Sequence, residues 1–228
     1  MRVKKTDKKT IKMGYFLGGA LALLSIVFTI LVKTVNVAPI GPNGSSVGFA
    51  SINRAFSELV GVNMTWYEIT EWLGLLPITF AAGYAVFGLV QLIRRRSLLK
   101  VDPGILALGG LFLVAFILYV VFDMVAINYR PVLIDGALDP SFPSSHTMLI
   151  LCICFGIALL NLTAYRGTLP KVINIVAIIL AIVILTGRIL SGTHWLTDII
   201  GGLLFANALL TFYCATLILL QKNLQKTS

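Results

Sequence analysis

Six long apolar runs constrain the fold of this chain more than any other feature of its sequence. A helix needs about 20 mostly apolar residues to cross about 30 Å of hydrocarbon, and each run is close to that length. The runs cover residues 13–32, 72–93, 103–127, 145–164, 172–190 and 195–220. Hydrophobic residues make up 58% of the sequence and charged residues 12%, whereas ordinary soluble domains carry about 25% charged residues. We expect an all-α, polytopic membrane protein whose six transmembrane helices form one bundle.

The chain is expected to form a single domain over residues 1–228, with its functional motifs in about residues 103–220. The first apolar run follows a basic segment, as in a signal peptide, but it exceeds the usual hydrophobic stretch of about 7–15 residues. It also lacks a small-residue cleavage site, so we interpret it as a retained anchor. The three cysteines, Cys152, Cys154 and Cys214, lie in apolar runs without metal-ligand spacing. We expect them to be small buried hydrophobic residues.

The basic residues predict the orientation of the bundle. Lys and Arg gather in the short cytoplasmic flanks of membrane spans, and alternation of six spans puts most of the 18 basic residues on one side. That side holds Arg2, Lys4, Lys5, Lys8, Lys9, Lys12, Arg94, Arg95, Arg96, Lys100, Arg166, Lys171, Lys222 and Lys226. Orientation therefore explains the net charge of +9 without nucleic-acid binding. Both termini are expected in the cytoplasm of a multi-pass cell-membrane protein.

The long connection between the first two spans contains a second kind of helix. Apolar side chains recur there at helical spacing, which predicts an amphipathic helix lying on the outer leaflet. They are Phe49, Ile52, Phe56, Leu59 and Val60, and the opposite face carries Asn53, Arg54, Ser57 and Glu58. The simpler interpretation is that this helix covers the bundle, because amphipathicity reports only an interface. The alternative is a gate through which a lipid substrate enters.

A second group of polar residues remains when the cytoplasmic charges are set aside. It lies at the outer ends of the third to sixth spans and contains both histidines of the chain. Its members are Asp123, Arg130, Ser144, Ser145, His146, Arg188, His194 and Asp198. Ionisable residues at membrane spans are rare and mark functional sites. Their convergence at one face predicts a site.

Residue types alone indicate what this site could do. His194 and Asp198 are four residues apart, so on a helix the carboxylate can orient the imidazole and stabilise its cation. His146 could give a proton to a departing oxygen. Arg130 and Arg188 carry guanidinium groups whose forked pairs of N–H donors match phosphate oxygens.

The two serines at the start of the fourth span complete the outline of a phosphate site. Ser144 and Ser145 offer hydroxyls and unpaired backbone N–H groups for an anion. Each residue of the group also has a structural interpretation: Ser144 as a helix cap, a histidine as an interfacial polar group, an arginine as a partner of lipid phosphate. Taken together, their complementary roles favour a catalytic pocket.

At these residues the sequence resembles the type 2 phosphatidic acid phosphatase superfamily, which includes membrane lipid phosphatases and vanadium haloperoxidases. The family pattern runs K-x6-R-P, then P-S-G-H, then S-R-x5-H-x3-D. Here the second part reads Pro143-Ser144-Ser145-His146, and the third reads Gly187-Arg188, five residues, His194, three residues, Asp198. Gly187 stands for the family serine and Ser145 for the family glycine.

The first part of the pattern departs more seriously. Arg130-Pro131 is present, but Asp123 occupies the position of the family lysine. A carboxylate there cannot bind phosphate as a lysine would. Three interpretations are open: Asp123 orients Arg130 through a salt bridge, it faces a cationic or hydroxyl part of the substrate, or the site is degenerate. We prefer the salt bridge, because seven residues are nearly two helical turns and the rest of the site is retained.

The resemblance implies a two-step mechanism that needs no metal or other cofactor. His194 attacks phosphorus to form a phosphohistidine, Asp198 orients it, and His146 protonates the leaving oxygen before water hydrolyses the intermediate. Arg130, Arg188, Ser144 and the backbone of Ser145 hold the phosphoryl oxygens.

A lipid phosphatase with an extracytoplasmic site is therefore the leading hypothesis. Its partners are membrane lipids and a lipid phosphate substrate, with no obligate protein partner evident. Undecaprenyl diphosphate, phosphatidylglycerophosphate and phosphatidic acid all fit the family, with a slight preference for the first. A non-catalytic anion-binding protein or transporter is the alternative, although no span centre carries the charge that a conduction path normally needs. Haloperoxidase activity with vanadate fits poorly with six membrane spans.

Overall fold

The computed structural model describes residues 8–227, which form seven α-helices and two short 3-10 helices without a β-strand. Six of these helices are long and apolar enough to cross a membrane, so the prediction of six spans is confirmed. The helices are α1 (Lys8–Thr34), α2 (Ala50–Val60), α3 (Met64–Arg95), α4 (Pro103–Met124), α5 (Ser145–Ala164), α6 (Thr168–Leu190) and α7 (Leu196–Thr227), with η1 (Pro42–Gly44) and η2 (Leu98–Lys100) between them. The amphipathic α2 lies between the first two spans, as the sequence predicts.

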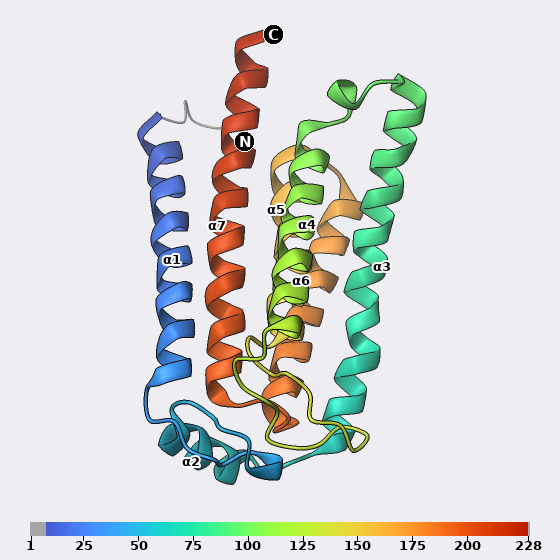
Figure 1. The fold of residues 1–228 in the computed structure, drawn as a ribbon. Coiled ribbons are helices and arrows are strands. Elements are labelled where there is room, and N and C mark those ends of the chain that lie inside the picture. The colour runs from blue at the N-terminus through green and yellow to red at the C-terminus, as the bar shows by residue number, and fades with distance from the viewer. Residues whose placement is uncertain (1–7, 228) are drawn as a thin grey trace.

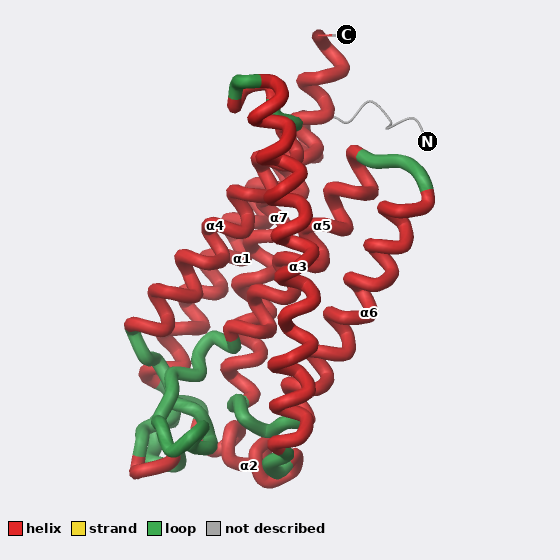
Figure 2. The backbone as a smooth tube through the Cα atoms, turned by 90° about the vertical axis from the view of Figure 1, so that its right-hand side faces the viewer, coloured by secondary structure: helices red, strands yellow, loops and turns green. Residues whose placement is uncertain are grey.

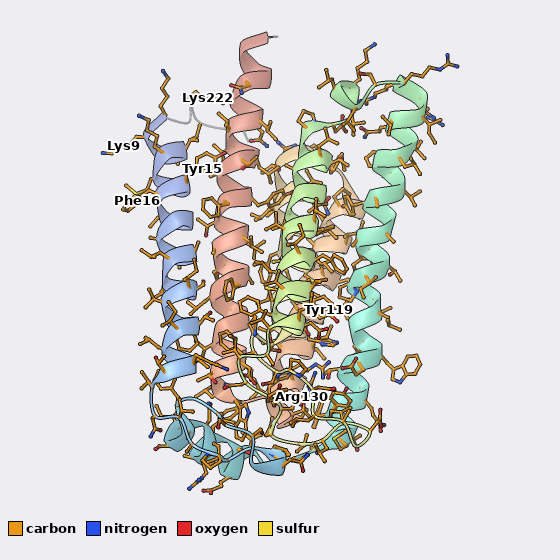
Figure 3. All side chains as sticks on the ribbon, viewed as in Figure 1. Lys9, Tyr15, Phe16, Tyr119, Arg130 and Lys222 are labelled. Atoms are coloured by element: carbon orange, nitrogen blue, oxygen red, sulfur yellow. The ribbon has the colours of Figure 1, made fainter. Side chains whose placement is uncertain are left out.

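The six long helices run side by side, and α2 lies across one end of the bundle (Figure 1). The start of α1 and the end of α7 lie at the opposite end, where the α3–α4 connection also turns. Lys9 and Lys222 lie at that end, whereas Arg130 lies at the end of α2 (Figure 3). Lys9 and Lys222 thus lie at one end of the bundle, which the orientation argument predicts to face the cytoplasm. Of that predicted group, Arg2, Lys4 and Lys5 lie outside the described residues.

The core of the bundle is built around α5. This helix contacts α3, α4, α6 and α7, and its buried side chains include Met148, Cys152 and Ile157. Cys152 and Cys154 are buried free thiols, and Cys214 is half-buried, so their predicted role as small hydrophobic residues fits. Apolar side chains on the outside of the bundle remain exposed because lipid tails, rather than water, would surround them.

The helix α3 begins at Met64, eight residues before the apolar run that predicted it. The side chain of Asn63 accepts a hydrogen bond of 3.2 Å from the backbone N–H of Trp66, which caps the helix. Backbone hydrogen bonding continues a helix through polar residues, so hydropathy placed this boundary too late. The extra turns carry Tyr67 and Glu71 into the bundle.

The helix α2 is fixed to the bundle through a residue expected on its polar, outward face. Asn53 is fully buried and donates hydrogen bonds to the carbonyl of Gly48 (2.8 Å) and to Oγ1 of Thr197 (2.9 Å). It also accepts one from the backbone N–H of Thr197 (3.2 Å). The expectation for Asn53 is therefore wrong, because this amide satisfies the first turn of α7. On the same helix, Ile52 and Leu59 are exposed, and the tie to α7 favours a cover over a gate.

Candidate active site

The predicted site residues meet at the end of the bundle that carries α2. The loop between α4 and α5 folds over this end together with the short connection from α6 to α7, and most of the loops of the chain gather there (Figure 2). Hydrogen bonds join Arg130 to His194 and Ser144 to Asp198, and the imidazole of His194 lies 3.6 Å from the carboxylate of Asp198. The α4–α5 loop with the start of α5, and the α6–α7 connection with the start of α7, thus supply one cluster.

His194 lies at the centre of this cluster and is almost completely buried. Its Nε2 is 3.3 Å from Nη1 of Arg130, and its Nδ1 is 3.6 Å from Oδ2 of Asp198. The pair does not share a helix face as predicted, because α7 begins at Leu196, after His194. Instead, the first turn of α7 carries the carboxylate back to the imidazole. Catalytic pairs of this kind often tighten when substrate binds.

The surroundings of His194 keep its imidazole neutral. Burial lowers the pKa of His194 well below its usual value, and the charges of Arg130 and Arg188 lower it further. A neutral imidazole whose Nδ1 carries the proton toward a carboxylate has its lone pair on Nε2. That lone pair is the group a nucleophile needs, and it points toward the guanidinium of Arg130.

Asp198 is buried and performs two structural tasks besides facing His194. Its Oδ2 accepts a hydrogen bond of 2.9 Å from the backbone N–H of Trp195, which caps the start of α7. Its backbone carbonyl accepts one of 2.9 Å from the N–H of Ser144. The starts of α5 and α7 are thereby locked together beside the imidazole.

The two arginines are placed side by side but are buried to different degrees. The side chain of Arg188 is fully buried, whereas Arg130 is partly exposed. The guanidinium carbon of Arg188 lies 5.0 Å from the centre of the Tyr67 ring, and that of Arg130 lies 5.9 Å from it. The ring therefore makes a cation–π contact with both arginines. Nε of both arginines and Nη1 of Arg188 have no hydrogen-bond partner among residues 8–227. These donors remain for an anion.

The start of α5 lies at the cluster, where the sequence predicts an anion-binding turn. Ser144 is the N-cap, but its hydroxyl makes no cap to the helix backbone and instead accepts a hydrogen bond of 3.1 Å from Thr147. Ser144 is fully buried, whereas Ser145 and His146 are partly exposed. The positive end of the α5 dipole therefore points at the cluster.

The residue that the sequence analysis missed is Glu71, on α3. Its Oε2 lies 3.4 Å from Nε2 of His146, and its Oε1 accepts a hydrogen bond from Nη2 of Arg188. The late boundary predicted for the second span left Glu71 in a loop, where a single carboxylate gives no signal. The spacing of Tyr67, Glu71 and Gly74 at i, i+4 and i+7 could have indicated a shared helix face.

Asp123 does not form the salt bridge that we preferred for it. The helix α4 ends at Met124, so Asp123 and Arg130 are not two turns apart on one helix, and no ion pair joins them within the described part of the chain. Asp123 instead lines a small cavity of about 30 Å³ together with Tyr119, Ser141, Ser145 and His194. A cavity of that size has room for water.

No group of three or more His, Cys, Asp or Glu side chains arranged to hold a metal ion occurs within residues 8–227. The positive charge of the cluster comes from Arg130 and Arg188 and from the start of α5.

Comparison with known proteins agrees with the family resemblance. Residues 122–221 match the model of the PAP2 superfamily. The chain is 29% identical over 177 residues to the "Bacitracin transport permease protein BcrC" of Bacillus licheniformis, covering 73% of this chain and 78% of that protein. The fold of this chain matches the crystal structure of a transmembrane PAP2-type phosphatidylglycerolphosphate phosphatase from Bacillus subtilis, with a TM-score of 0.57 and 20% identity. That match covers 92% of this chain and 97% of the other.

Proposed function

We propose that this membrane protein is a phosphatase of the PAP2 superfamily, whose model residues 122–221 match, and that it hydrolyses a lipid phosphate or diphosphate. The single observation that carries the proposal is the environment of His194. A buried neutral imidazole lies between the Asp198 carboxylate and the Arg130 guanidinium, which is the arrangement that a nucleophile of phosphoryl transfer requires.

In the first step, Nε2 of His194 attacks phosphorus, and the bond from phosphorus to the lipid-side oxygen breaks. The imidazolium cation that forms is stabilised by the negative charge of Asp198, which faces its Nδ1. The proton on Nε2 of His146 passes to the departing oxygen, so the lipid leaves as an alcohol or, from a diphosphate, as a monophosphate.

In the second step, water attacks phosphorus and gives a proton to His146 while the nitrogen–phosphorus bond breaks. Inorganic phosphate leaves, and both histidines return to their starting state. The unpaired donors of Arg130 and Arg188 and the first turn of α5 hold the equatorial oxygens in both steps. Fixed guanidinium groups carry the charge stabilisation in this scheme, which therefore proceeds without a metal ion.

Asp123 replaces the family lysine without disabling this scheme. Its position beside the cavity next to His194 supports a contact with a hydroxyl group or with water. The interpretation of a degenerate site instead predicts that the wild-type protein has no activity.

The substrate is proposed to be a lipid phosphate reached from the extracytoplasmic leaflet, with undecaprenyl diphosphate as first choice. One protein with the same fold is described as a phosphatidylglycerolphosphate phosphatase, and one sequence relative is described as a transport permease. The second description keeps the transporter alternative in view. Hydrolysis and transport are distinguished by whether inorganic phosphate is released.

The proposal is tested with protein purified in detergent. Phosphate release is measured from undecaprenyl diphosphate, phosphatidylglycerophosphate and phosphatidic acid, each with and without EDTA. We expect phosphate release that EDTA leaves unchanged, fastest with undecaprenyl diphosphate. No release from any lipid would contradict the proposed activity and favour the alternative. Release that EDTA abolishes would instead overturn the metal-free scheme.

A further inference from the structure

Glu71 stands outside the matched family segment, yet it contacts two residues of the proposed phosphatase site. Each oxygen of its carboxylate serves a different partner: Oε1 accepts a hydrogen bond from Arg188, and Oε2 lies 3.4 Å from Nε2 of His146. The three residues come from three helices, α3, α6 and α5. A single side chain thus links the proposed proton donor to a proposed phosphate ligand.

A face of α3, rather than one isolated residue, forms this side of the site. Tyr67, Glu71 and Gly74 follow at intervals of four and three residues and so share a helix face. The Tyr67 ring lies 5.0 Å from the Arg188 guanidinium carbon. A Cβ atom placed on Gly74 would lie 3.4 Å from Cδ2 of His146, so the imidazole rests against the helix backbone there.

The approach of α3 to α6 depends on Gly187, where the family pattern has serine. A Cβ atom on Gly187 would lie 2.4 Å from Cγ2 of Thr70 and 3.3 Å from Cε3 of Trp66. A Cβ atom there would have to displace the Thr70 side chain or shift α3 away from α6. Gly187 therefore permits the close approach of α3 to α6 that brings Glu71 beside Arg188.

The charge of Arg188 explains why a carboxylate is needed at this place. The Arg188 side chain is fully buried, and a buried guanidinium without a partner is strongly destabilising. Glu71 pairs with Nη2 only, and the Nε and Nη1 donors have no hydrogen-bond partner within residues 8–227. The pair thus holds the Nη2 end of the Arg188 guanidinium in place and leaves Nε and Nη1 for phosphate.

We propose that Glu71 is a positioning residue for phosphoryl transfer, which holds the Arg188 guanidinium and the His146 imidazole in place until the lipid phosphate arrives. This inference rests on the proposed function. The other groups that face His146 are Arg188 from α6, Arg130 from the α4–α5 loop and His194 from the α6–α7 connection. Glu71 is the carboxylate among them, so its removal would leave the His146 imidazole facing two guanidinium groups.

The test compares Glu71→Gln with Glu71→Asp and with Glu68→Gln, a control on an exposed carboxylate of the same helix. Phosphate release from undecaprenyl diphosphate and phosphatidic acid in detergent is measured against pH. We expect Glu71→Gln to lower kcat about 10- to 100-fold, as losses of orienting partners do, with a smaller change in KM. The alkaline limb of its rate profile should move to lower pH. Glu71→Asp should restore part of the rate, and Glu68→Gln should behave as wild type.

A second readout does not depend on turnover. The chain has only two histidines, so the ring signals of histidine-labelled protein can be assigned with a His194→Ala variant. In Glu71→Gln, the His146 ring should lose its proton at lower pH than in the wild type. An unchanged His146 titration, an unchanged or higher kcat, or a lower kcat with an unaltered pH profile would overturn the positioning role. An inactive wild type would contradict the proposed function itself, and the His146 titration would still decide whether Glu71 controls the imidazole.

Discussion

At the scale of single residues, burial decides the protonation state of His194. Desolvation lowers the pKa of this imidazole first, and the cationic neighbours Arg130 and Arg188 lower it further. The neutral form is the one that can attack phosphorus. The attraction between Asp198 and the imidazole becomes strong only as attack turns the imidazole into an imidazolium. Interactions that strengthen on the way to the transition state accelerate a reaction.

A pH profile tests this point. Because the pKa of His194 is lowered, its lone pair should remain free well below its ordinary titration range near pH 6.5. We expect kcat/KM of the wild type to show no loss from nucleophile protonation near that pH. Arg130→Gln, which removes one cause of the lowered pKa, should move the acidic limb to higher pH.

The shape of the profile, rather than the absolute rate, is the relevant measurement, because Arg130 is also a proposed phosphate ligand. An acidic limb that stays at the same pH in Arg130→Gln would contradict the assignment of His194 as the nucleophile under electrostatic control.

At the scale of elements, the distance between α3 and α6 is set by one small residue. Gly187→Ser would restore the family serine, but the new side chain would meet Thr70 and Trp66. Overpacking of this kind typically costs about 1–3 kcal/mol. We therefore expect a lower thermal unfolding midpoint and a lower rate of phosphate release, because α3 must carry Glu71 away from Arg188.

The matched control for that variant is Gly110→Ala in α4, where an added Cβ meets no atom within 4 Å. Alanine in an exposed helical position should be neutral or stabilising. Full stability and activity in Gly187→Ser would show that α3 can move aside without consequence.

Helix boundaries show where sequence reasoning succeeded and where it failed. The limits of α5 were predicted correctly because an apolar run begins and ends with that helix. The start of α3 was missed because its first two turns contain Tyr67, Glu68 and Glu71, which hydropathy reads as a loop. Glu71 could not be predicted as a site residue for the same reason, since its role exists only when α3 packs on α6.

The site around His194 was predictable to a different degree. The motif spacing predicted that Arg130, His194 and Asp198 would lie together, and they do, because the α4–α5 loop meets the start of α7 at one end of the bundle. The Asp123 salt bridge failed because the sequence does not show that α4 stops at Met124. Asn53 was misplaced because its partner, the first turn of α7, is distant in sequence.

At the scale of the whole molecule, the basic residues that flank the chain termini and the proposed site lie at opposite ends of the bundle. Lys9 and Lys222 lie at the end of the termini, and Arg130 lies at the other (Figure 3). The asymmetry of basic residues predicts that the terminal end faces the cytoplasm. The proposed site then faces the extracytoplasmic leaflet.

This orientation is tested by cysteine labelling in intact cells. Ala137 lies in the α4–α5 loop and is exposed, so Ala137→Cys should react with a membrane-impermeant maleimide from outside. Leu99→Cys, at an exposed position of the α3–α4 connection, should react only after lysis. The reverse pattern would invert the orientation and move the site to the cytoplasmic face.

The most direct measurement of the central claim is the initial rate of phosphate release by His194→Ala beside the wild type. Both proteins are purified in the same detergent, checked for equal thermal unfolding, and given the lipid that the wild type cleaves fastest. Loss of a nucleophile removes nearly all catalysis, so we predict a fall of at least about 10³-fold. A His194→Ala variant that releases phosphate at the wild-type rate would contradict the account.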